Sequence, residues 1–134
     1  MLRIRREQHD ALGDKDFLDR LEVLVAEALF HRKVSAAERA RLPLRAMCEH
    51  GVGVARGYGL ETERDLTVFV LNMITINPEF HRQPHIHDIL RDPSLSPPDR
   101  REKLLMDVSD EAWDEAARMT DADRYWTRVL SPEA

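Results

Sequence analysis

The sequence contains one cysteine, Cys48, among 134 residues. A single cysteine excludes an internal disulfide and a metal site built from several thiolates, and its simplest interpretation is a reducing compartment. No apolar run approaches the roughly 18 residues that a membrane-spanning helix needs. The opening residues, MLRIRREQHD, lack the apolar segment of a secretory signal. We therefore expect a cytoplasmic protein, which a secretion machine could still export in folded form.

Glycine is also scarce, with five residues, and β-branched residues form no long alternating runs. Both features argue against an all-β fold. The hydrophobic fraction of 43% and the charged fraction of 34% fit a soluble helical protein. The formal net charge of −5 disfavours nucleic acid as a partner, because phosphate binding needs a concentrated basic face.

Apolar side chains recur at three- and four-residue spacing, which is the period of an amphipathic helix. We expect the first long helix over residues 16–32. A separate short helix is expected over residues 5–12, broken at Gly13.

Prolines and capping residues divide the rest of the chain. Pro43 either kinks the second helix or restarts it, and Asn77-Pro78 ends the most apolar helix, which we expect to be central. Caps or a first-turn proline indicate further helix starts at Ser35, Thr62, Pro84, Ser96, Ser109 or Asp110, and Thr120. The sequence predicts an all-α fold, a compact single-domain bundle of about six or seven helices, several short, over residues 1–134.

Three histidines and an aspartate form the densest set of potential metal ligands: His81, His85, His87 and Asp88. Zinc accepts imidazole and carboxylate ligands. However, Pro84 keeps His81 and His85 from facing one way on an unbroken helix, and His85 and His87 point to different sides of a helix. A partly exposed connector is the ordinary interpretation of this segment, and a metal site is the alternative.

No recognised catalytic arrangement is present. Cys48 and His50 lie about 200° apart on a helix, so the imidazole cannot activate the thiol, and a buried structural cysteine is favoured. Helix capping explains the serines. The sequence has no nucleophile elbow, P-loop or dinucleotide-binding glycine fingerprint. We therefore expect no enzymatic activity and no cofactor.

Charged residues gather in two segments. Glu61, Glu63 and Asp65 are explained as acids that stabilise a helix dipole. The alternative is that this segment, which includes Arg64, forms a buried ion pair or an acid/base pair. Arginines 82, 91, 100 and 101 lie near several aspartates. We interpret these as surface pairs, each contributing about 0–1 kcal/mol.

Two groups of residues are candidates for contacting a partner protein. The first is the connector, with Phe80, His81, His85 and His87. The second is the set of C-terminal aromatic residues, since aromatic side chains dominate interface hot spots: Trp113, Tyr125 and Trp126. The aromatic residues are equally well explained as part of the core of a small bundle.

Four segments follow motifs that occur together. The opening has Ile4, Arg5, Glu7 and Gln8 in a pattern similar to I-R-x-E-Q, with Arg6 in the intervening place. Residues 58–65, YGLETERD, form a turn into the expected core helix, and the segments MITINPEF (residues 73–80) and ILRDPSL (residues 89–95) follow it. With these motifs the chain resembles a bacterial family of small helical proteins encoded beside spike and tip proteins of the type VI secretion system, whereas HIHDIL departs from the family pattern.

The resemblance implies a helical accessory protein and brings no catalytic residues with it. Our leading hypothesis is a non-enzymatic adaptor, chaperone or co-effector that binds a type VI secretion effector or spike component. One alternative is an immunity protein, whose acidic surface would suit a basic toxin. Another is a metal-dependent enzyme or toxin that uses His81, His85, His87 and Asp88. Neither nucleic acid nor membrane is expected as a partner, and the sequence leaves the oligomeric state open.

Overall fold

Eight α-helices and one short 3-10 helix follow one another in the computed structural model, which describes residues 2–131 and the side chains of residues 14–131. The elements are α1 (Leu2–His31), α2 (Ala36–Arg41), α3 (Leu44–Gly57), α4 (Glu63–Thr75), η1 (Phe80–Arg82), α5 (Pro84–Leu90), α6 (Pro97–Met106), α7 (Asp110–Ala116) and α8 (Ala122–Leu130). The described residues contain no strand, and the fold is the predicted all-α bundle with several short helices.

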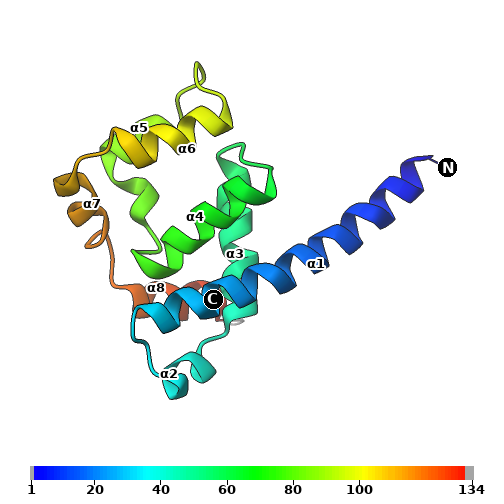
Figure 1. Ribbon diagram of the computed structural model, residues 1–134, viewed down its shortest axis with the longest axis horizontal. Coiled ribbons are helices and arrows are strands. Elements are labelled where there is room, and N and C mark those ends of the chain that lie inside the picture. The colour runs from blue at the N-terminus through cyan, green and yellow to red at the C-terminus, as the bar shows by residue number, and fades with distance from the viewer. Residues whose placement is uncertain (1, 132–134) are drawn as a thin grey trace.

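The long first helix, α1, is continuous through Gly13, so the predicted break between residues 5–12 and the following helix is wrong. One glycine in a helix interior costs only about 1 kcal/mol, and no proline accompanies it. The N-terminal turns of α1 project beyond the rest of the molecule (Figure 1). Its C-terminal half buries one stripe of side chains: Phe17, Leu21, Val25 and Leu29.

Helices α3 and α4 form the centre of the bundle. In Figure 1, α4 lies between α1 on one side and α5 and α6 on the other, and it contacts α1, α3 and α6. This arrangement confirms the central position expected of the most apolar helix. Helix α8 packs against α3, and α7 packs against η1.

Local capping explains most helix boundaries. Ser35, Thr62, Ser96 and Ser109 each accept a hydrogen bond from a backbone N–H three residues on, as predicted. Pro43 separates α2 from α3, so the chain restarts there rather than kinking.

The cap of the last helix differs from the prediction. Asp121, rather than Thr120, accepts from the backbone N–H of Arg124. The carbonyl of Thr120 instead accepts from the Asn77 side chain, at 2.8 Å. Asn77 also donates to the Ala117 carbonyl, at 3.2 Å. The stop signal after α4 therefore also ties that helix to the end of α7, a long-range contact that no local pattern indicates.

The buried side chains form one core cluster that runs through α1, α3, α4, the connector and the C-terminal helices. Cys48 has no exposed surface and lies in this core, as predicted. Across the described residues, no helix combines the length and the apolar character needed to cross a bilayer.

Candidate functional site

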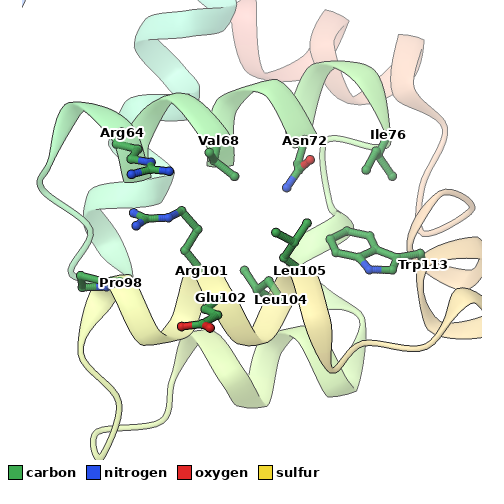
Figure 2. A pocket seen from close by; sticks show the side chains of 10 residues that line it. All are labelled: Arg64, Val68, Asn72, Ile76, Pro98, Arg101, Glu102, Leu104, Leu105 and Trp113. Carbon is green, nitrogen blue, oxygen red and sulfur yellow. The ribbon is translucent and has the colours of Figure 1, made fainter.

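An open groove of about 540 Å³ lies between α4 and α6. Figure 2 shows its lining side chains, which come from two helical stripes and α7: Arg64, Val68, Asn72 and Ile76; Pro98, Arg101, Glu102, Leu104 and Leu105; and Trp113. The α4 residues recur every four positions, and the α6 residues follow three- and four-residue spacing. The groove therefore lies where α6 leaves this stripe of α4 partly uncovered.

The two ends of the groove differ in chemistry. Arg64 and Arg101 lie together at one end, whereas Ile76, Leu105 and Trp113 surround the other (Figure 2). Leu105 is 78% exposed. Together with Ile76 and Trp113 it lines one side of the groove, and contiguous apolar surface of this kind is typical of interaction sites.

A buried ion pair holds the cationic end of this groove. Asp65 is 3% exposed and pairs with Arg101 of α6. The Thr62 hydroxyl donates a second hydrogen bond to the Asp65 carboxylate, at 2.9 Å. The alternative of a buried ion pair among the acids of this segment is thus correct for Asp65, but its partner is Arg101. The prediction that Arg101 forms a surface ion pair is therefore wrong.

Trp113 lies partly in the groove and partly against the core. Its ring stacks on Phe80, with centroids 6.2 Å apart and planes 17° apart. Phe80 is completely buried, so it cannot touch a partner, and its assignment as a contact residue is wrong. Trp113 is half-buried and lines the groove, which keeps it among the candidates.

A second cavity, which we call the arginine cleft, opens where the end of α3, η1, α5 and α8 meet. It measures about 660 Å³ and is lined by Tyr58, Glu79, His81, Arg82, His87, Arg91, Tyr125, Arg128 and Val129. Three of the predicted contact residues converge here: His81, His87 and Tyr125. The arginines and Tyr58 were not predicted as site residues, because they come from four separate segments and no sequence spacing connects them.

His81 forms the floor of the arginine cleft and is 8% exposed. Its Nδ1 lies 2.8 Å from the hydroxyl of Tyr58. Burial lowers the pKa of His81 to about 4, and a hydrogen bond to the backbone of Pro78 offsets this only in part. Burial also raises the pKa of Tyr58. Both groups are therefore uncharged at neutral pH, and one hydrogen bond joins the tyrosine hydroxyl to the imidazole.

Tyr125, which also lines the arginine cleft, forms a similar tyrosine–histidine pair with His50. Its hydroxyl lies 2.7 Å from Nε2 of His50, and Trp126 packs edge-on against both rings. Burial raises the pKa of Tyr125 and lowers that of His50. Tyr125 is buried and Trp126 half-buried, so the predicted C-terminal aromatic residues mainly anchor α8 to α3.

The predicted metal ligands do not come together. His85 and Asp88 are exposed on α5 and do not line the arginine cleft, whereas His81 is buried beneath it. Within residues 14–131, no group of three or more histidine, cysteine, aspartate or glutamate side chains is placed to hold a metal ion. The geometry therefore gives no support to a metal-dependent activity built on His81, His85, His87 and Asp88.

The thiol of Cys48 is not a nucleophile in the folded protein. Burial raises its pKa to about 12, so the reactive thiolate is absent at neutral pH. His50, the neighbour considered for activation, instead bonds to Tyr125.

Comparisons of the chain with models of known protein families, with curated proteins and with solved structures gave no match.

Proposed function

We propose that this protein binds a partner protein through the groove between α4 and α6, and that it serves as an adaptor, chaperone or co-effector for a type VI secretion effector or spike component. The observation that carries the binding role is the open apolar wall at Leu105, Ile76 and Trp113. The identity of the partner rests on the family resemblance of residues 58–65, 73–80 and 89–95.

The chemistry of the groove specifies the kind of segment that would bind. An amphipathic helix docks in an apolar groove by inserting residues from one face. The apolar end would receive such residues, with Trp113 as the aromatic anchor. Arg64 is exposed at the other end, and the ion pairs found among residues 14–131 do not include one for it. The partner segment should therefore carry an acidic residue opposite Arg64.

Adjacent exposed residues of α6 provide a matched test. Leu105 is 78% exposed and lines the groove, whereas Met106 is 71% exposed and does not. Replacing either side chain with glutamate should leave the fold intact, because both already face water. In affinity capture from the native bacterium, we expect Leu105→Glu to lose a secretion effector or spike protein that the wild type and Met106→Glu both retain.

A charge reversal tests the other end of the groove. Arg64 and Arg124 are both exposed and both lie in the first turn of a helix, α4 and α8 respectively. Glutamate suits both positions because it complements the helix dipole. With the captured partner purified, Arg64→Glu should weaken binding about tenfold or more, and Arg124→Glu should not.

Three results would contradict the proposal. In the first, the partner binds Leu105→Glu as well as wild type. In the second, light scattering shows that the wild type forms a concentration-dependent dimer that Leu105→Glu abolishes, which would make a second copy of the chain the occupant. In the third, the chain protects cells from a neighbouring toxin, which an adaptor should not do.

A further inference from the structure

We propose that the arginine cleft binds a small molecule carrying a phosphate monoester. Three guanidinium groups line this cavity, from Arg82 at the end of η1, Arg91 at the end of α5 and Arg128 on α8. They come from elements separated along the chain, and only the fold brings them together. This inference is independent of the groove between α4 and α6.

The charge of the cleft is opposite to that of the protein. The chain has a formal net charge of −5, yet three arginines line the cleft with a single carboxylate, Glu79. At neutral pH the His81 imidazole adds no charge, because its pKa is about 4. The cleft therefore has two unbalanced positive charges, and the dianion of a phosphate monoester would neutralise them.

The contacts of Glu79 leave the guanidinium groups of Arg82 and Arg128 available to bind an anion. Its carboxylate lies 3.5 Å from Arg82 and 3.9 Å from Arg128, which is longer than a close charge-assisted hydrogen bond of about 2.7–2.9 Å. The side chains of Arg82 and Arg128 are 66% and 65% exposed. A single carboxylate at these distances therefore does not saturate two guanidinium groups.

Aromatic rings hold two of the arginines in position. The Arg91 guanidinium lies over the Tyr58 ring, 4.6 Å from its centroid, and Arg128 lies over the Tyr125 ring at 5.6 Å. The ion pairs found among residues 14–131 include none for Arg91. Stacking orients a guanidinium without neutralising it, so less side-chain entropy is lost when an anion binds.

The size of the cleft favours an organic phosphate over a free ion. A volume of about 660 Å³ is within the range of ligand pockets, about 300–1,000 Å³, and greatly exceeds what inorganic phosphate fills. Val129 and Tyr58 also line the cleft, and their half-buried side chains provide apolar surface for the attached group. A guanidinium group can donate two parallel hydrogen bonds to two oxygens of one phosphate, and this geometry would fix the orientation of the ligand.

Calorimetric titration with phenyl phosphate, inorganic phosphate and benzoate tests the proposal. We expect saturable binding of phenyl phosphate, weaker binding of inorganic phosphate and no measurable binding of benzoate, a monoanion. Arg82→Gln and Arg91→Gln should each weaken phenyl phosphate binding about tenfold. Arg124→Gln, an exposed arginine of α8 outside the cleft, should leave it unchanged.

A gain of affinity gives the sharper test. Glu79→Gln removes the only carboxylate of the cleft, so phenyl phosphate should bind several-fold more tightly. Glu111→Gln removes an exposed acid of α7 outside the cleft and should have no effect. Equal gains in phenyl phosphate affinity in both variants would show a general effect of net charge and would overturn the proposal.

Three other outcomes would also overturn the proposal. One is the absence of phenyl phosphate binding by the wild-type protein. Another is a loss in Arg124→Gln equal to that in Arg82→Gln. The third is binding to vesicles that contain phosphatidic acid without binding to phenyl phosphate, which would assign the same phosphate chemistry to a lipid headgroup. Circular dichroism of each variant shows whether a loss comes from the cleft or from unfolding.

Discussion

His81 makes the stability of the protein depend on pH. Its folded-state pKa is lowered from 6.5 to about 4 by burial, so between these values the unfolded chain binds a proton that the folded chain excludes. Stability is therefore complete above pH 6.5 and falls as the pH drops towards 4. The loss should reach about 3 kcal/mol, and His50, whose pKa is also lowered by burial, acts in the same direction.

Urea unfolding at several pH values measures this effect. His81→Gln should reduce the loss of unfolding free energy between pH 6.5 and 4, whatever its effect on stability at pH 7. His85→Gln changes an exposed residue of α5, and its unfolding free energy should vary with pH as that of the wild type does. If His81→Gln also kept the wild-type pH dependence, other groups would be the cause of the acid sensitivity.

Individual residues also show what sequence can and cannot indicate. The burial of Cys48 follows from its place on an apolar helix stripe, and it was predicted correctly. The pairing of Tyr58 with His81, or of His50 with Tyr125, joins residues far apart in the chain. No local spacing encodes such contacts, so the arginine cleft could not be found before the fold was known.

At the scale of elements, the close approach of α3 and α4 depends on Gly51. A Cβ atom at this position would lie 2.9 Å from Cγ2 of Val70, which is itself fully buried. Gly53 lies in the same helix, exposed, and a Cβ there would meet nothing within 4 Å. The two glycines therefore have the same effect on helix propensity but opposite surroundings.

Alanine at each position separates these effects. Gly53→Ala should stabilise the protein by up to about 1 kcal/mol, through helix propensity alone. In Gly51→Ala the same gain is outweighed by overpacking against Val70, leaving a net loss of about 1 kcal/mol. Thermal unfolding of the two variants should therefore shift Tm in opposite directions, and a shared increase would show that α4 can move away at little cost.

The ion pair between α4 and α6 gives a second prediction at this scale. Arg101→Met leaves Asp65 buried without its charged partner and should cost about 3 kcal/mol in unfolding free energy. Adding Asp65→Asn should recover part of the loss, because no unpaired buried charge remains. Arg64→Met, in the same groove, removes an exposed arginine and should change stability by less than about 0.5 kcal/mol. Chemical denaturation of the wild type and these three variants checks the prediction.

Element boundaries were predictable where the signal is local. The serine caps and the Thr62 cap each depend on residues three positions apart, and all were identified correctly. The break at Gly13 was wrong because one glycine is a weak signal against a run of helix-forming neighbours. The cap expected at Thr120 lies one residue further on, at Asp121, and the Thr120 carbonyl accepts from Asn77, which follows α4.

At the scale of the whole molecule, the composition and periodicity sufficed for the all-α fold, whereas both surfaces depend on how the helices assemble. The groove needs α6 to cover α4 incompletely, and the arginine cleft needs four segments to meet. The buried ring of Phe80 contacts Trp113 beside the groove and His81 beneath the cleft. One core residue therefore supports both surfaces.

This shared core predicts a single cooperative unfolding transition. The buried side chains form one cluster that includes residues of α1, α3, α4 and the C-terminal helices, and small domains with one core usually unfold in a two-state manner. Trp113 reports on the α7 side and Trp126 on the contact between α8 and α3. In Trp113→Phe and Trp126→Phe, the fluorescence of the remaining tryptophan should change at the same urea concentration as the far-ultraviolet circular dichroism of that variant. Separate midpoints within one variant would instead show that the C-terminal helices unfold independently of the rest of the core.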